Sequence, residues 1–125
     1  MLRLSLVLLA ALTASRLHAV THIVTDESDF NALPTLNAGD EVILQAGNYG
    51  ALDKTLVSSI SDDASAQSNP IRIYAEVAGS VNVTAPSRIY LDGRGIILAG
   101  LNFTSGSGMI DNASTSPASL CSVRF

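Results

Sequence analysis

The stretch "SRIYLDGRGIILAGLNFTSG", residues 87–106, decides the fold. It contains apolar couplets separated by glycines: the couplets are Ile89/Leu91, Ile96/Leu98 and Leu101/Phe103, and the glycines are at positions 93, 95, 100 and 106. Apolar residues that alternate with other residues over three to five positions indicate short β-strands with one buried face. Glycine between them permits the positive φ of a sharp corner. The stretch therefore predicts short strands joined by tight corners.

The same alternation occurs upstream, where β-branched residues dominate. These couplets are Val42/Leu44, Ile71/Ile73 and Val81/Val83. The connections in residues 87–106 hold few residues and lack hairpin turn sequences, with Asp92-Gly93 the single exception. Consecutive strands are therefore not expected to pair as antiparallel neighbours. Instead, each strand pairs in parallel with the strand one full coil later, which is a parallel β-helix.

This arrangement predicts a register. Ile71/Ile73 should lie against Ile96/Leu98, about 25 residues on, and Val81/Val83 against Leu101/Phe103, about 20 residues on, both within the range of solenoid repeats. Inward couplets then stack into aliphatic columns, and glycines occupy the corners. We predict an all-β solenoid.

Other segments add detail at the N-terminal side. Residues 21–24 are expected to form a first strand, and a short helix is expected at 27–33, burying Phe30 and Leu33 before Pro34 ends it. No other helix is expected. Residues 53–69 break the alternation and are expected to form a loop at one corner, either a surface excursion or part of a binding face.

Residues 1–19 have the pattern of a signal peptide. Arg3 precedes the apolar run 4–12, and cleavage is expected after Ser15 or after Ala19. The run is too short for a membrane span, which takes about 20 residues, although an uncleaved anchor is the alternative. Residues 20–125 would then form the mature, secreted chain, extracellular or periplasmic, with no stable membrane insertion.

The charge of the mature chain excludes binding partners that need a basic surface. Removal of Arg3 and Arg16 leaves five of the seven basic residues against eleven acidic ones, a net charge of −6. Nucleic acid is therefore not expected as a partner. An anionic ligand would need a local basic site, for which Arg72, Arg88 and Arg94 are the clustered candidates. Cys121 is the single cysteine, so no disulfide is expected.

Two stretches together resemble the N-terminal coils of the alginate lyase and chondroitinase B family of polysaccharide lyases. They are "GDEVILQAGNY" (39–49) and "NPIRIYAEVAGSVNVTAPSRIYLDGRGIILAGLNFTSG" (69–106), preceded by the short helix. The shared features are Gly-Asp before an apolar strand, a Gly-x-Tyr turn, Pro-Ile-x-Ile-x-Ala-Glu and Gly-Leu-x-Phe. The order of these motifs is more specific than any one of them.

The resemblance implies a right-handed parallel β-helix with an N-terminal capping helix. It also implies cleavage of acidic, uronate-containing polysaccharide, alginate or chondroitin and dermatan sulfate, by β-elimination. In that family a calcium ion neutralises the uronate carboxylate, a lysine removes the C5 proton and an arginine assists the leaving oxygen. A metal that spreads the developing charge makes such a weak carbon acid reactive.

No catalytic, cofactor-binding or metal-binding residue carries over to this chain, because the family's site lies in later coils. Lys54 matches no family motif and is expected to be a solvated surface charge. Asp62 and Asp63 are expected to be solvated rather than calcium ligands, so no calcium is expected in this segment. Glu76 is expected to be a corner residue whose hydrogen bonds involve the backbone.

The C-terminal residues suggest an incomplete solenoid. Cys121, Val123 and Phe125 alternate as a new strand would, and no polar capping segment follows. We therefore expect the chain to be the N-terminal fragment of a longer enzyme, itself inactive. A product closed by dimerisation, or a frame change after about residue 110, is the alternative.

Other functions remain open. A non-catalytic β-helix, such as a surface adhesin or glycan-binding module, needs no site at all. A β-helical hydrolase would need paired aspartates, and Asp92 is isolated. Three glycosylation patterns begin at Asn82, Asn102 and Asn112. The first two lie in predicted strands, where stacked outward asparagines explain them without glycans.

Overall fold

The structure, a computed structural model, describes residues 18–104, 108–112 and 122–124, with side chains for 18–104. Short strands dominate it, and two short helices interrupt them. The elements are β1 Thr21–Val24, α2 Glu27–Asn31, β2 Glu41–Leu44, β3 Gly47–Tyr49, β4 Asp53–Val57, α3 Asp63–Ser68, β5 Ile71–Ala75, β6 Val81–Val83, β7 Ser87–Asp92, β8 Ile96–Ala99, β9 Leu101–Phe103, β10 Gly108–Asn112 and β11 Ser122–Arg124.

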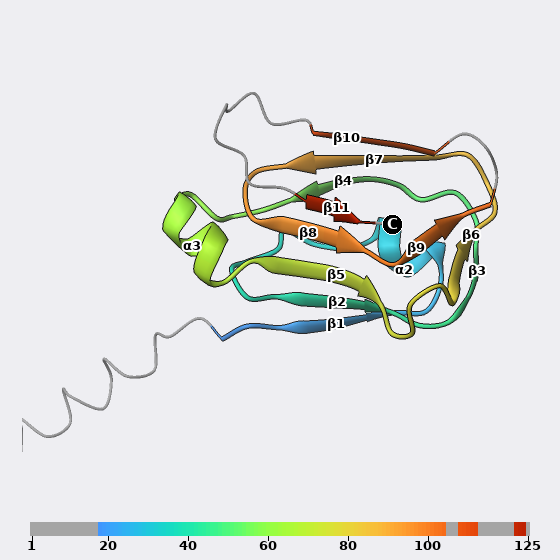
Figure 1. The fold of residues 1–125 in the computed structure, drawn as a ribbon, viewed down its shortest axis with the longest axis horizontal. Helices are drawn as coiled ribbons and strands as arrows, with labels where there is room; N and C mark the ends of the chain where they lie inside the picture. Colours follow the sequence, from blue (N-terminus) through green and yellow to red (C-terminus); the bar gives the residue numbers. More distant parts are fainter. Residues whose placement is uncertain (1–17, 105–107, 113–121, 125) are drawn as a thin grey trace, which may run out of the picture.

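The strands form three parallel sheets that the chain visits in rotation (Figure 1). One sheet has the order β1-β2-β5-β8-β11, the second β3-β6-β9 and the third β10-β7-β4. From β2 onward, each strand of the first sheet is followed by one of the second and one of the third, except that β11 is the last strand described. Strands therefore pair with others one circuit away and not with sequence neighbours, as predicted.

The predicted register is confirmed. On β5 and β8, Ile71 is opposite Ile96 and Ile73 is opposite Leu98. On β6 and β9, Val81 is opposite Leu101 and Val83 is opposite Phe103. Because side chains alternate between the two faces of a strand, this register brings every one of these couplets to the inner face.

The inner faces of the three sheets form one hydrophobic core. Its strand residues are almost fully buried, and they are Val24, Val42, Leu44, Tyr49, Leu56, Ile71, Ile73, Ala75, Val81, Val83, Ile89, Leu91, Ile96, Leu98 and Leu101. Full burial of one Val, Leu or Ile side chain contributes about 1.5–3 kcal/mol. Stacked rows of such residues therefore hold successive circuits together.

Glycines occupy corners, as predicted. Gly93, Gly95 and Gly100 have φ values of 110°, 71° and 77°, a region that side chains disfavour. Two of them are also crowded: a Cβ at Gly93 would lie 2.8 Å from Ser58 O, and a Cβ at Gly95 would lie 2.9 Å from Ile60 Cδ1 and 3.0 Å from Ala66 Cα. Only glycine lets the chain turn from β7 into β8 at this point.

The predicted N-terminal helix is present as α2, which ends at Asn31 and not at residue 33; it buries Phe30, and Leu33 is buried beyond its end. Asp26 caps it by accepting a hydrogen bond from Asp29 N at 2.8 Å. Asn31 at its end binds the segment leading into β4: Asn31 Oδ1 accepts from Asp53 N at 3.0 Å, and Asn31 Nδ2 donates to Ala51 O at 3.3 Å. The helix is thus tied to the next circuit.

The prediction that residues 53–69 form a loop is wrong. They contain β4 and α3. Lys54 occupies the inward position between Leu52 and Leu56. A charged residue there breaks the apolar alternation by which β4 could be predicted as a strand. The helix α3 is short, and its start is set by Asp62, whose carboxylate accepts from Ser65 N at 2.7 Å and Ser65 Oγ at 2.9 Å. The Gly-x-Tyr motif at residues 47–49 was also expected to be a turn, but these residues form the strand β3.

Several sequence predictions fall outside the described residues. They concern the signal segment 1–17, Gly106, Cys121 and Phe125. Within the described segments, neither helix has the length and apolar character that a membrane crossing requires.

Candidate functional site

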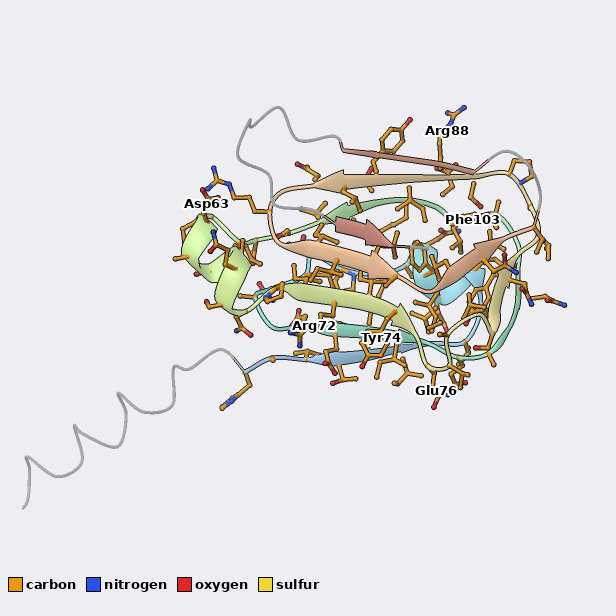
Figure 2. The ribbon with its side chains drawn as sticks, viewed as in Figure 1. Asp63, Arg72, Tyr74, Glu76, Arg88 and Phe103 are labelled. Carbon is orange, nitrogen blue, oxygen red and sulfur yellow. The ribbon has the colours of Figure 1, made fainter. Side chains whose placement is uncertain are left out.

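The three arginines proposed as a basic cluster are spread over the molecule. Arg72 is on β5 and Arg88 on β7, which belong to different sheets, and both are exposed (Figure 2). Arg94 binds the helical insert: its Nη1 lies 3.2 Å from Asp63 Oδ1 and donates to Ser61 O at 3.2 Å. The arginines therefore form no common anion site.

Asp62 and Asp63 each make an interaction within the structure that involves α3. Asp62 caps α3, and its hydrogen bonds from Ser65 N and Ser65 Oγ lower the pKa of its carboxyl. Asp63 pairs with Arg94. Across the described residues, no three or more His, Cys, Asp or Glu side chains converge as metal ligands would. Calcium takes about six to eight oxygen ligands, and the residues present do not fit it.

The structure places Lys54 on the inward row of β4 and not on the outer face of the sheet. It lies on β4 opposite the fully buried Ile89, on the inward row with Leu52 and Leu56, and is half-buried. Its aliphatic stem can pack against apolar neighbours while the ammonium reaches water. A lysine directed this way does not face the outer surface of the sheets.

Glu76 and Asp92 lie at strand ends. Glu76 follows β5 and is exposed; its backbone N–H donates to Leu44 O at 2.8 Å, as expected of a corner residue. Asp92 ends β7 and is also exposed, and its backbone carbonyl accepts from Ser58 N at 2.8 Å. Neither carboxylate has a hydrogen-bond or ion-pair partner among the described residues.

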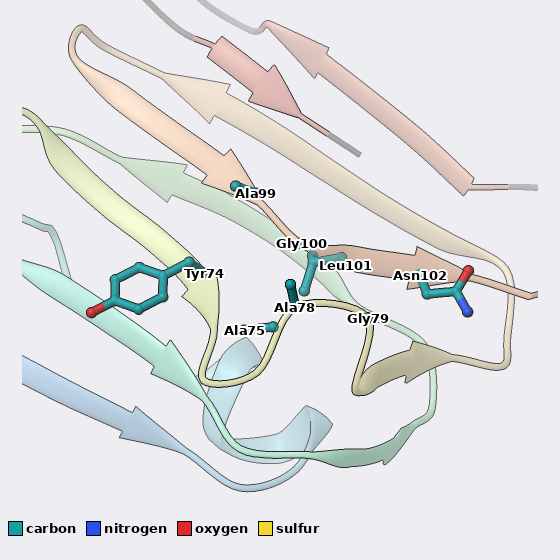
Figure 3. A pocket seen from close by; sticks show the side chains of 8 residues that line it. All are labelled: Tyr74, Ala75, Ala78, Gly79, Ala99, Gly100, Leu101 and Asn102. Carbon is teal, nitrogen blue, oxygen red and sulfur yellow. The ribbon is translucent and has the colours of Figure 1, made fainter.

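A hollow on the outer surface is the best candidate for ligand contact. It arises where residues 76–80 connect β5 to β6 while Gly100 alone connects β8 to β9, so that the longer connection projects beside the shorter one (Figure 3). Its volume is about 550 Å³. Its lining is Tyr74, Ala75, Ala78, Gly79, Ala99, Gly100, Leu101 and Asn102.

The hollow has an aromatic side chain at one end and an amide at the other. Tyr74 is half-buried on the outer face of β5, and Asn102 lies on β9 (Figure 3). Small residues between them leave the space open. An aromatic ring with nearby polar groups suits a ligand that has an apolar face and hydroxyl groups, such as a sugar ring. No carboxylate, histidine, lysine or arginine is among its lining residues, and the Tyr74 phenol is the ionisable group there.

Asn102 is also the end of a hydrogen-bonded row on the outer face of β3, β6 and β9. Asn82 Nδ2 donates to Asn48 Oδ1 at 3.4 Å, and Asn102 Nδ2 donates to Asn82 Oδ1 at 2.9 Å. The expectation of stacked outward asparagines is therefore confirmed. The third glycosylation pattern, at Asn112, extends outside the described residues.

The hollow was not foreseen in the sequence. Its residues belong to two circuits, and it depends on the unequal lengths of two connections. The five-residue connection after β5, "EVAGS", with the exposed Val77 at 61% exposure, was the available signal. Nothing in the residue types alone distinguishes this connection from an ordinary corner.

The chain was compared with models of known protein families. The family model described as Chondroitinase B matches residues 24–122, from the end of β1 to the first residue of β11. No curated protein matches the chain.

Proposed function

The chain belongs to the chondroitinase B family, and from this we propose that it is the N-terminal part of a secreted polysaccharide lyase. Its substrate class would be uronate-containing polysaccharide, alginate or chondroitin and dermatan sulfate, met outside the cell or in a periplasm. The observation that carries the proposal is the extent of the family match, residues 24–122, which reaches from the first strand to the last.

We propose further that the three sheets are the first coils of a right-handed parallel β-helix and that α2 is its N-terminal cap. Parallel pairing one circuit apart supports this arrangement. β4 lies at the edge of its sheet. Support for the cap comes from Asn31, the last residue of α2, whose Oδ1 accepts from Asp53 N at one end of this edge. At the other end, Leu36 N, which lies outside α2, donates to Val57 O at 2.8 Å. Edges covered in this way resist pairing with another chain.

The proposed reaction is calcium-assisted β-elimination, in which a base removes the proton next to the uronate carboxylate. The described residues do not fit calcium, and Lys54 is half-buried on the inward row of β4. We therefore propose that the base, the arginine and the metal ligands belong to coils that follow residue 125 in a longer protein. The present chain would supply the folded N-terminal coils and an outer surface for glycan contact.

The test compares two proteins: the 125-residue chain and a version extended through the downstream reading frame. Each is incubated with alginate or with dermatan sulfate, and the unsaturated uronate product is followed by ultraviolet absorbance. We expect product from the extended protein, lost on chelation of calcium, and none from the 125 residues alone. Turnover by the short chain would show that the site has been placed wrongly. Absence of product from the extended protein on every uronate polysaccharide would refute the lyase proposal.

A glycan-binding protein without catalysis is the second candidate, and the hollow between Tyr74 and Asn102 favours it. Under this alternative the extended protein binds oligosaccharide but releases no product. Tyr74→Ala should weaken binding about tenfold, since loss of an aromatic contact in binding sites costs more than about 1 kcal/mol. Tyr90, half-buried on β7 of another sheet, gives the matched control Tyr90→Ala. Equal effects of the two substitutions would exclude the hollow as the binding surface.

A further inference from the structure

Asp40 is a buried carboxylate without a cationic partner. It is 1% exposed, in the turn that leads into β2. Its Oδ1 accepts from Val20 N at 2.8 Å, and its Oδ2 accepts from Asn37 N at 2.8 Å. Buried carboxylates in proteins are normally paired with a charge. Among the described residues, the ion pair present is Arg94 with Asp63, so no side chain supplies a counterion to Asp40.

Val20 is held beside Asp40 by hydrogen bonds at both its backbone nitrogen and its backbone carbonyl. Val20 comes one residue before β1, and its carbonyl accepts from Glu41 N at 3.0 Å. The Val20 side chain is 48% exposed. The preceding residues His18 and Ala19 are exposed and outside any helix or strand. Val20 N is therefore fixed beside Asp40, while His18 and Ala19 are exposed to solvent.

The position of Val20 coincides with one of the two cleavage points expected for the signal peptide. We propose that processing occurs after Ala19 and that the new α-ammonium group of Val20 is the counterion of Asp40. Hydrolysis of the Ala19–Val20 bond consumes one water. It leaves a carboxylate on Ala19 of the released peptide and a primary amine on Val20, which takes up a proton near neutral pH.

Cleavage at the alternative point, after Ser15, would not produce this pair. Val20 N would remain a neutral amide, and the new ammonium would lie on Arg16, four residues upstream. With cleavage after Ala19, one N–H of the ammonium replaces the existing amide N–H toward Oδ1, and the others face water. Charge-assisted hydrogen bonds are shorter and stronger than neutral ones, and burial of Asp40 reduces screening of the attraction. Processing would thereby strengthen the junction of β1 and β2.

The first experiment identifies the mature end. The full chain with its own leader is exported from a secreting host, and the mass and N-terminal sequence of the exported protein are determined. The expected first residue is Val20. An exported chain that begins at Arg16, or that retains Met1, overturns the proposal. The result does not depend on lyase activity, so it stands or fails separately from the proposed function.

The second experiment tests the charge pair. Chains that begin at Val20 or at Arg16 are prepared, each with Asp40 and with Asp40→Asn, and their unfolding constants are measured at neutral pH. We expect Asp40→Asn to raise the unfolding constant about tenfold more in the chain that begins at Val20, which is about 1.4 kcal/mol of coupling. Asp92→Asn, at an exposed acid without a partner among the described residues, is the control and should show no coupling. Equal effects in both chains overturn the proposal.

A third measurement needs no substitution, in case Asp40→Asn prevents folding. The α-amine of each folded chain is treated with an acylating reagent at neutral pH, and N-terminal modification is followed by mass spectrometry. An amine held as ammonium by Asp40 should react about tenfold more slowly than the free amine of Arg16. Equal rates would show that Val20 is not paired and would overturn the proposal.

Discussion

Replacement of Ile73 by alanine measures how strongly the stacked inward rows stabilise the fold. Ile73 is fully buried on β5, opposite Val42 on β2 and Leu98 on β8. The change removes three carbon atoms, which corresponds to about 2.4 kcal/mol at roughly 0.8 kcal/mol per buried methylene. Strands on both sides hold the neighbours in place, so a cavity adds to this loss. We expect the free energy of unfolding to fall by about 3–4 kcal/mol.

The assay is urea denaturation of the full chain followed by far-ultraviolet circular dichroism. Arg72→Ala is the control, because Arg72 is the adjacent residue on the outer face of β5 and is exposed. It should change stability by no more than about 0.5 kcal/mol. Ile73→Val should cost about 0.5–1.5 kcal/mol and gives a graded point if the alanine variant does not fold. A larger loss for Arg72→Ala than for Ile73→Ala would refute the reasoning, because a strand shifted by one residue exchanges its faces.

Further substitutions test the buried phenol of Tyr49 and the corner at Gly95, with Gly79 for comparison. Burial, followed by the nearby acidic charges, raises the pKa of Tyr49, so the folded state favours the neutral phenol. The resulting stability is present below the ordinary pKa of about 10 and is lost as the pH rises through the folded-state pKa. Tyr49→Phe should therefore reduce the loss of unfolding free energy above about pH 10. At neutral pH the substitution should cost about 1 kcal/mol, because it removes the hydrogen bond from the Tyr49 hydroxyl to Gln45 O. An unchanged loss of unfolding free energy above about pH 10 would contradict this. Gly95→Ala should cost at least about 2 kcal/mol, from positive φ and the contact with Ala66. Gly79→Ala, with φ of +80° in open space, should cost about 1–2 kcal/mol in the same denaturation assay. Equal losses at the two glycines would show that the Gly95 corner is not crowded.

The register could be predicted from the sequence where the inward rows are continuous. Ile71 and Ile73 repeat the pattern of Ile96 and Leu98, and a slip of one residue would turn one of the two couplets out of the core. Burial of one face specifies register strongly. The glycine corners between β7, β8 and β9 could be predicted as well, because the connections there are short and hold Gly93, Gly95 and Gly100.

The prediction failed where a charged residue occupies an inward position. Lys54 breaks the row of β4, and its burial is tolerated because β4 is the first strand of its sheet. The sequence does not identify α3, because aspartate and serine are typical of loops as well as of helix caps, although the spacing of Asp62 and Ser65 is that of a cap. The sequence of α3, DASAQS, holds only small and polar residues, whereas α2 carries the apolar Phe30 after its cap.

The candidate site could not be predicted for a different reason. The hollow beside Tyr74 depends on the relative lengths of connections in two circuits, and the role of Asp40 depends on a contact 20 residues away in the sequence. The Gly39-Asp40 motif indicated a family resemblance. Its physical basis, a carboxylate that joins Asn37 and Val20, became apparent only in the structure.

The parallel pairing of strands one circuit apart is tested most directly by nuclear Overhauser contacts in the full chain. The structure predicts cross-strand contacts between β5 and β8 that join Ile71 to Ile96 and Ile73 to Leu98. Contacts that instead join Leu91 to Ile96 across Asp92-Gly93, in antiparallel order, would show a hairpin and would contradict the fold.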